Sequence, residues 1–314
     1  MRLHPTLALL LLLAAACGPA AAPVPRAAVP GIDPVSGALG AVEVDLPGAD
    51  LASVRGPAGA VLVGAALEAG RASGGGSPDC PLRRSASGAL QTWSARCASL
   101  LGAYAALERA RGFLLSAGAE ALAPAPVLAE PRLAANDASD AEVASGLHYL
   151  PQADAFSLLA GPAGARVPAA LNPGAVTREV ARRHLRGLLE SHPGEAEGVA
   201  LFFGAAASGD PGYLAASEPQ GDPRGELDLA RPLSPGAPAA AVVAGALWAW
   251  ADASGDALAA SRAALAAARV LASVRDAGDA PALLSLVAEQ LDGAERDQAC
   301  AVFRARAGRL PACP

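Results

Sequence analysis

The run Thr177-Arg178-Glu179-Val180-Ala181-Arg182, a few residues after Asn172, decides how the rest of the chain is interpreted. Asn172 can cap a helix that begins at Pro173, because a proline at the first helical position gives up no hydrogen bond. On this helix Arg178 and Arg182 lie four residues apart and share one face. Another face carries an apolar stripe of Ala181, Leu185, Leu188 and Leu189. The sequence therefore predicts an amphipathic helix that starts at residue 173.

This helix resembles the zinc-binding helix of the thermolysin and fungalysin type of metallopeptidase, which reads His-Glu-x-x-His. In that family the two histidines bind zinc from one helix face, and the glutamate is the general base. Arg178 and Arg182 stand at the two histidine positions, and Glu179 stands at the position of the base. The resemblance thus implies a helix that has lost both of its histidine ligands.

A second segment resembles the next helix of the same family, roughly His-Glu-Gly-x-Ala-Asp-Tyr-Phe. It runs from Glu195 to Phe203, so that Glu197 stands at the third zinc ligand and Leu201 at the family's aspartate. Four further segments resemble parts of the family in the family's order. Residues 100–115 resemble the long first helix and residues 148–159 the strands before the zinc helix. Residues 207–211 resemble the exit from the second helix, and residues 243–248 resemble a later helix. Together they imply an α+β fold of the zincin-like type, mostly helical in its C-terminal half.

The same resemblance implies an inactive homologue, because a catalytic zinc needs three protein ligands and an open position for water. Arginine cannot replace histidine there, since its guanidinium stays protonated and offers no lone pair to a cation. Residues 236 to 242, which correspond to the family's transition-state histidine, have no polar side chain. We therefore expect no catalytic residues and no zinc cofactor.

The histidines are the remaining candidates for a replacement metal site. His148 falls on an expected strand, where a half-exposed position is the simpler interpretation. His184 lies two residues beyond Arg182, roughly 200° round the helix, and cannot share its face. His192 falls in a Ser-His-Pro-Gly turn, where we expect it to be solvated. The alternative is an active metallopeptidase with an unusual ligand set of His184, His192, Glu195 and Glu197.

Glu179 and Glu197, at the family's general-base and third-ligand positions, predict a structural role for Arg178 and Arg182. Without zinc, Glu179 and Glu197 would face each other with no cation to offset their charges. Arg178 and Arg182 can supply that charge through ion pairs. We therefore expect contacts from the Glu197 carboxylate to one or both guanidinium groups. Ordinary surface arginines are the alternative.

The first residues indicate export. Met1-Arg2 and the apolar run from Leu7 to Ala16 form a signal peptide, because a membrane span needs about 20 apolar residues. The residues 14–17, Ala-Ala-Ala-Cys, resemble a bacterial lipobox, so Cys17 is expected to carry lipid and anchor the protein to the cell envelope. Gly18, in place of aspartate, favours the outer membrane by analogy with other lipoproteins. An ordinary signal peptide cut near Ala16 is the alternative.

Composition and periodicity divide the chain into four expected parts. Residues 1–16 are the signal peptide, 17–36 a Pro/Ala-rich tether, 37–98 a small β-containing region and 99–314 the zincin-like domain. Period-two alternation predicts strands in the third part, and its residues 70–78 are expected to form a loop. The long helix expected from Ala98 to Gly118 should bury Leu100, Tyr104, Leu107 and Leu114.

Four cysteines remain after Cys17, and an even number in an exported protein implies disulfides. Four cysteines allow three connectivities, of which we expect the local one, Cys80 with Cys97 and Cys300 with Cys313. The absence of any Cys-x-x-Cys spacing argues against metal binding by these residues.

The sequence suggests a function in binding rather than catalysis. The formal net charge of −6 gives no electrostatic basis for binding nucleic acid. The expected protein is a lipid-anchored pseudopeptidase that binds peptides or protein partners in a remnant cleft and reaches the membrane through Cys17. A structural helical lipoprotein unrelated to peptidases is a further alternative.

Overall fold

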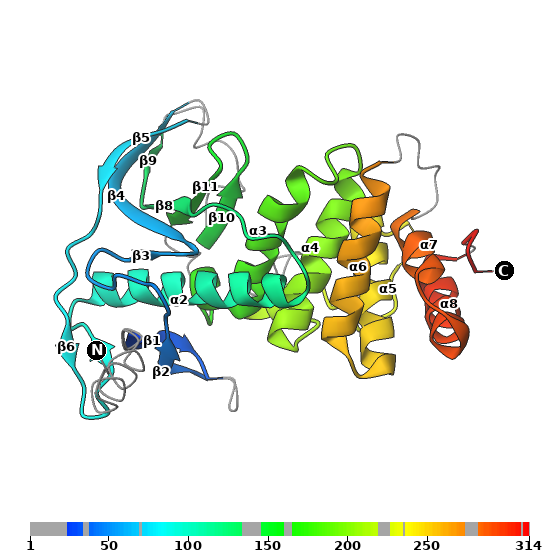
Figure 1. Cartoon of the computed structure of the whole chain (residues 1–314), viewed down its shortest axis with the longest axis horizontal. Helices are drawn as coiled ribbons and strands as arrows, with labels where there is room; N and C mark the ends of the chain where they lie inside the picture. Colours follow the sequence, from blue (N-terminus) through cyan, green and yellow to red (C-terminus); the bar gives the residue numbers. More distant parts are fainter. Residues whose placement is uncertain are drawn as a thin grey trace, which may run out of the picture.

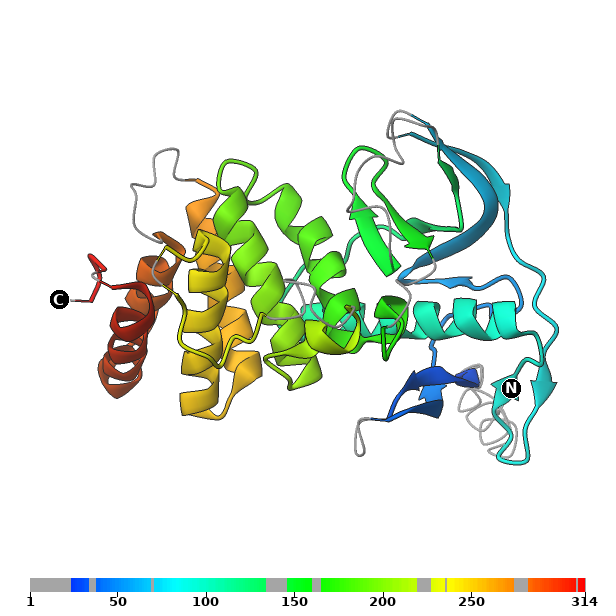
Figure 2. The same ribbon diagram turned by 180° about the vertical axis from the view of Figure 1, so that it is seen from behind.

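Strands gather at one end of the molecule and helices follow one another toward the other end (Figures 1 and 2). The structure is a computed structural model, and it describes residues 24–33, 38–68, 71–133, 146–159, 165–218, 227–234, 236–273, 282–308 and 310–313. This mixed arrangement confirms the expected α+β class. The signal peptide and Cys17 lie outside the described residues.

The larger sheet has seven strands. Five of them lie in the order β10-β11-β8-β4-β3, and β3 is short. Strands β4, β8 and β11 are parallel, whereas β10 is antiparallel to β11 at the edge. Strands β5 and β9 also pair with β4. The strands are β3 (Arg55–Gly56), β4 (Gly59–Glu68), β5 (Arg71–Gly76), β8 (Ala125–Ala129), β9 (Arg132–Leu133), β10 (Gly146–Leu150) and β11 (Ala155–Leu159).

The smaller sheet has the strand order β2-β1-β7-β6. Strands β1 (Arg26–Ile32) and β2 (Leu39–Asp45) are antiparallel, and the two-residue strands β6 (Arg83–Arg84) and β7 (Leu90–Gln91) complete it. The expected tether of residues 17–36 is therefore wrong for residues 26–32. The Pro/Ala-rich composition of residues 26–32 does not predict a strand. Their backbone nevertheless pairs with β2 along the whole length of β1.

Two other expectations fail because strand pairing links remote segments. Most of the expected loop at residues 70–78 is strand β5, which pairs with β4 although every one of its residues is exposed. Gly74 and Gly75 take φ angles of +65° and +83°, a backbone conformation that glycine tolerates. The expected division at residue 98 runs through one sheet, because β4 pairs with β8 from Gly59↔Ala125 to Val63↔Ala129.

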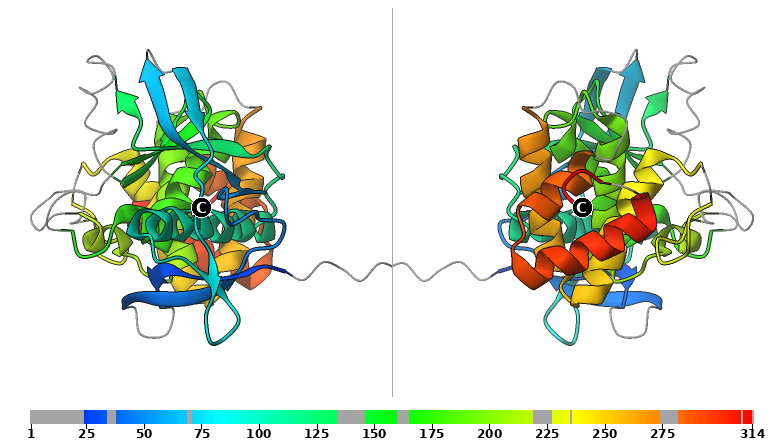
Figure 3. Two further views of the ribbon diagram at one scale, coloured as in Figure 1. Left: turned by 90° about the vertical axis from the view of Figure 1, so that its left-hand side faces the viewer. Right: turned by 90° about the vertical axis from the view of Figure 1, so that its right-hand side faces the viewer.

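Helix α2 (Ala95–Ser116) lies between the two sheets and contacts both of them (Figure 3). Its N-cap is Ser94, whose side chain accepts a hydrogen bond from the backbone N–H of Cys97. The face expected to be buried is buried, at Leu100, Tyr104, Leu107 and Leu114. This helix thus gives the two sheets a shared core.

The remaining helices stack successively beyond α2. Asn172 caps α3 as expected, accepting hydrogen bonds from Gly174 N and Ala175 N, with Pro173 as the first helical residue. No helix in the described ranges is long and apolar enough to cross a membrane. The helices are α3 (Pro173–Arg186), α4 (Pro193–Ser208), α5 (Ala239–Ser254), α6 (Ala257–Leu271), α7 (Ala282–Glu289) and α8 (Gly293–Ala307), with short 3-10 turns η2 (Ala169–Leu171) and η3 (Tyr213–Ala216).

The structure contains both local disulfides. Cys80 is bonded to Cys97, which joins the segment before β6 to α2, and Cys300 is bonded to Cys313, which ties the C-terminal residues to α8. Of the three possible connectivities, the local one is therefore confirmed. Cys80, Cys97, Cys300 and Cys313 are all buried.

Two glycines let the ring of Tyr213 fit between α3 and α4. A Cβ at Gly174 would lie 2.5 Å from the ring, and one at Gly204 would lie 2.6 Å from the ring's Cζ and hydroxyl oxygen. Tyr213 is 3% exposed. The close approach of the two helices therefore depends on the absence of side chains at these positions.

We expect Gly204→Ala to lower the free energy of unfolding by about 1–3 kcal/mol, because the new methyl group displaces the Tyr213 ring. The matched control is Gly112→Ala in α2, where an added Cβ meets nothing within 4 Å. That change should stabilise the protein by about 0.5–1 kcal/mol through helix propensity. Urea unfolding of both variants measures the difference, and equal effects would contradict the packing argument.

Candidate functional site

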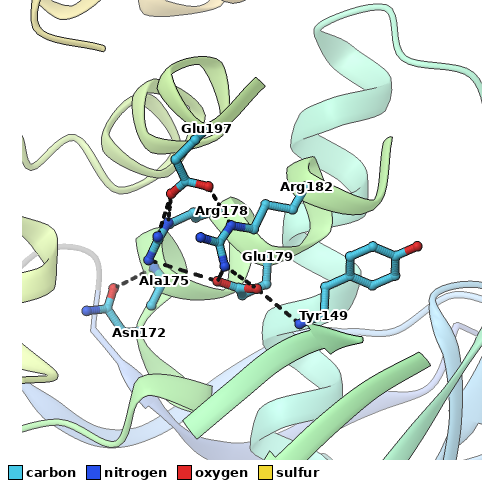
Figure 4. Close-up of polar contacts among 7 residues, drawn as sticks. All are labelled: Tyr149, Asn172, Ala175, Arg178, Glu179, Arg182 and Glu197. Atoms are coloured by element: carbon cyan, nitrogen blue, oxygen red, sulfur yellow. Dashed lines mark hydrogen bonds and ion pairs between the residues drawn. The ribbon is translucent and has the colours of Figure 1, made fainter. Parts of the chain in front are cut away.

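Helices α3 and α4 place two arginines around one carboxylate (Figure 4). The Nε of Arg178 donates to Glu197 Oε1 at 2.8 Å, and the Nε of Arg182 donates to Glu197 Oε2 at 2.7 Å. The second donor of Arg178, Nη2, also bonds to Oε1. Each carboxylate oxygen thus has its own guanidinium. The contacts expected of Glu197 are confirmed for both arginines.

Glu179 is the second carboxylate at this site, and its side chain is 3% exposed. Arg182 Nη1 donates to its two oxygens at 3.1 and 3.3 Å, and the backbone N–H of Tyr149 donates to Oε2 at 3.0 Å. Tyr149 belongs to edge strand β10, so Glu179 joins α3 to the sheet (Figure 4). The four side chains, Arg178, Glu179, Arg182 and Glu197, are called the ion-pair cluster below.

The charges of the ion-pair cluster sum to zero, which makes its partial burial tolerable. Burial alone raises the pKa of the Glu197 carboxyl, but the charges and hydrogen bonds of Arg178 and Arg182 outweigh burial and hold that pKa below its usual range. Burial lowers the pKa of Arg178, and the Glu197 charge more than restores it. Glu197 therefore stays ionised in the folded protein at neutral pH.

The carboxylate oxygens of the ion-pair cluster are all engaged in hydrogen bonds. Both oxygens of Glu197 and both oxygens of Glu179 already accept hydrogen bonds. Within the described ranges, no three histidine, cysteine, aspartate or glutamate side chains group closely enough to hold a metal ion. The cluster can orient the two helices and present charge to the groove beside it.

His184 lies in α3, and His192 is the N-cap residue of α4. His184 lines the same small cavity as Leu107 of α2 and Phe156 of β11, and burial lowers its pKa to about 4. His192 is 8% exposed, so the expectation that it is solvated is wrong. Its N–H bonds to Leu189 O and its carbonyl accepts from Ala196 N, which folds the turn back onto the helices. The alternative ligand set of His184, His192, Glu195 and Glu197 does not form a metal-binding group in the described structure.

A second polar network fixes the outer face of α3. Arg183 donates from Nε and Nη2 to the two oxygens of Asp154, both at 2.8 Å, and from Nη1 to Ala123 O at 2.9 Å. The Tyr149 hydroxyl donates to Asp154 Oδ1 at 3.1 Å. The Arg183 hydrogen bonds hold the pKa of Asp154 below its usual value. Sequence reasoning missed this network, because Asp154 and Arg183 have no spacing that marks them as partners.

A groove of about 260 Å³ opens beside the ion-pair cluster, between the last turn of α3 and the first turn of α4. Its walls combine charge with apolar surface: Arg182, Arg186, Glu190 and Glu197 alternate with Leu189, Pro193 and Ala196. The solvent side of Glu197 is thus accessible, since its side chain is 25% exposed.

No protein-family model matches the chain, and no curated protein matches it significantly.

We expect Glu197→Gln to cost about 2 kcal/mol of stability at neutral pH, because it leaves two guanidinium groups with one remaining carboxylate. Glu195→Gln is the matched control, on the same helix turn and outside the ion-pair cluster. Thermal unfolding measures both variants.

The same substitution should change the dependence of stability on pH. The pKa of Glu197 is lower in the folded than in the unfolded state, so its contribution is complete above the unfolded value of about 4.3 and is lost as pH falls through the folded pKa. The difference between wild type and Glu197→Gln should therefore shrink in acid. If the stability difference between wild type and Glu197→Gln stayed the same at every pH, even where Glu197 is fully protonated, it would contradict the lowered pKa of Glu197 in the folded state.

Proposed function

We propose that this protein is an exported, lipid-anchored homologue of the thermolysin and fungalysin type of metallopeptidase that has lost its zinc site. It binds a peptide or protein partner and does not cleave it. One observation carries the proposal: the three residues at the family's ligand positions, Arg178, Arg182 and Glu197, meet at a single carboxylate.

The order of elements supports a zincin-like fold. A long helix, α2, is followed by strands β8, β10 and β11, then by α3 with the His-Glu-x-x-His-like run and by α4 with Glu197. Helices α3 and α4 pack side by side. The alternative of a helical lipoprotein unrelated to peptidases would be favoured if these two helices were apart.

The ion pairs take over the structural role of the lost metal. In the proposed ancestor a zinc ion joined the two helices through three ligands, and here two guanidinium groups join them through one carboxylate. Arg178 donates two hydrogen bonds to one oxygen of Glu197 and Arg182 donates one to the other, and these charge-assisted bonds fix the helix positions much as coordination bonds would. The groove beside the ion-pair cluster can thus keep its shape although the zinc site is lost. Partner binding is the function that this shape supports.

Restoring the histidines tests the proposed ancestry. We expect Arg178→His with Arg182→His to bind one zinc ion per chain after dialysis, with Glu197 as the third ligand. Adding Glu197→Gln should abolish the binding. Arg183→His with Arg186→His is the matched control on the same helix and should bind no stoichiometric zinc. Elemental analysis of the folded variants gives the answer. A folded double variant without zinc would contradict the proposed site.

Partner binding is tested separately, with peptides selected against the immobilised wild-type protein. Arg186→Glu reverses a charge at the rim of the groove and should weaken the selected peptides by about tenfold. Arg71→Glu, an exposed position in β5 far from the groove, should leave their affinity unchanged. Fluorescence anisotropy measures both. Equal affinities for both variants would remove the groove as the binding site.

A further inference from the structure

A cavity of about 440 Å³ lies where α2, the end of β1, the start of α3 and the end of α4 meet. It is separate from the groove beside the ion-pair cluster, since no described residue lines both. Helix α3 lines the cavity with Pro173 and Thr177, near its start, and the groove with Arg182 and Arg186, near its end. The volume lies within the range of about 300–1,000 Å³ that is usual for small-molecule sites. The cavity therefore has room for a small ligand.

Arg109 brings an unpaired positive charge to this cavity. It lies on α2, and its Nη2 is 3.6 Å from the position that a Cβ on Gly31 of β1 would take. Within the described ranges no hydrogen bond or ion pair holds its guanidinium, although the side chain is accessible to solvent. Burial lowers the pKa of Arg109, and no acid lies close enough to raise it again. A bound carboxylate would supply the partner that the fold does not.

Two carboxylates line the same cavity. Asp210 follows the end of α4, and its Oδ1 accepts a hydrogen bond from the N–H of Gly212 at 2.8 Å. No cation in the described part of the chain pairs with Asp210, whereas Asp33 already has an interaction partner. A simple anion in the cavity would thus meet two carboxylates as well as Arg109, and a simple cation would meet Arg109. A ligand that carries both charges matches this lining better than either.

Thr177 adds a buried hydroxyl between the charged groups and the apolar walls. The residue is 2% exposed and lines the cavity from α3, and its hydroxyl makes no hydrogen bond to any described residue. A buried hydroxyl is rarely left without a partner, because its lost hydration is costly. The apolar side chains of Ile32, Phe113 and Val167 cover other parts of the wall. The cavity therefore combines both charges, a free hydroxyl and apolar surface.

We propose that this cavity binds a dipeptide in its zwitterionic form. The carboxylate of the dipeptide pairs with Arg109, its ammonium group pairs with Asp210, and its peptide group bonds to the Thr177 hydroxyl. The apolar walls receive its side chains. Two residues are the fitting length because Arg109 and Asp210 do not pair with each other, and two extended residues separate the terminal charges by about 7 Å. The site depends neither on the zinc ancestry nor on the lipid anchor.

Isothermal titration calorimetry with three related ligands tests this assignment. The ligands are alanyl-leucine, its C-terminal amide, which lacks the carboxylate, and its N-acetyl form, which lacks the ammonium charge. The variants are Arg109→Gln and Asp210→Asn. Arg71→Gln and Glu195→Gln are the matched controls, because neither residue lines the cavity. Circular dichroism establishes that each variant is folded.

We expect the wild-type protein to bind alanyl-leucine about tenfold more tightly than either blocked ligand, since each block removes one ion pair. Arg109→Gln should weaken the free dipeptide about tenfold and leave the affinity for the amide unchanged. Asp210→Asn should do the same for the free dipeptide and leave the affinity for the N-acetyl form unchanged. This pattern assigns each ligand charge to one side chain, as a double-mutant cycle does. Both controls should bind all three ligands as the wild type does.

Equal affinities of the wild type for the three ligands, or no saturable binding of alanyl-leucine at millimolar concentration, would overturn the proposal. This comparison needs no variant and is therefore independent of any folding defect. Arg186→Glu separates the cavity from the groove. If that change abolished dipeptide binding while Arg109→Gln had no effect, the dipeptide would occupy the groove. The cavity would then be excluded as its site, and the proposed function would stand.

Discussion

One carboxylate held by two guanidinium groups determines how α3 and α4 meet. Glu197 lies on α4, and Arg178 and Arg182 lie one helical turn apart on α3, so both oxygens find donors only at one spacing of the helices. Removing any of the three would leave a partly buried charge without its partner, which is costly. Glu179 extends the constraint to the sheet through the backbone of Tyr149. The position of α3 relative to its neighbours is therefore set by charge as well as by apolar packing.

Helix packing and the ion-pair cluster depend on each other. Gly174 and Gly204 admit the Tyr213 ring between α3 and α4, and Asn172 caps α3 while its amide group bonds to Tyr213 O at 2.7 Å. The apolar contacts bring the helices close and exclude most of the water around the charges. In that drier environment each ion pair is stronger than it would be on the surface. Burial and charge together thus fix the relative positions of α3 and α4 at this site.

Local features were predictable because the residues that decide them are neighbours in the chain. The start of α3 follows from Asn172 and Pro173, and the buried face of α2 follows from the spacing of Leu100, Tyr104, Leu107 and Leu114. The ion pairs of Glu197 were also expected, but through a family resemblance and not through a local rule. Strands β1 and β5 were missed because their Pro/Ala-rich and Gly/Ser-rich sequences lack the alternation that marks a strand.

By itself, then, the sequence determined the α+β class, the capped start of α3 and the residue types of the ion-pair cluster. Tertiary structure alone decided that β4 pairs with β8 across the expected domain division, that Tyr149 donates to Glu179 and that His192 is buried. The physical reason is the range of the interactions. Caps, turns and apolar faces depend on residues a few positions apart, whereas strand pairing and buried hydrogen bonds depend on segments that meet only after the chain has folded.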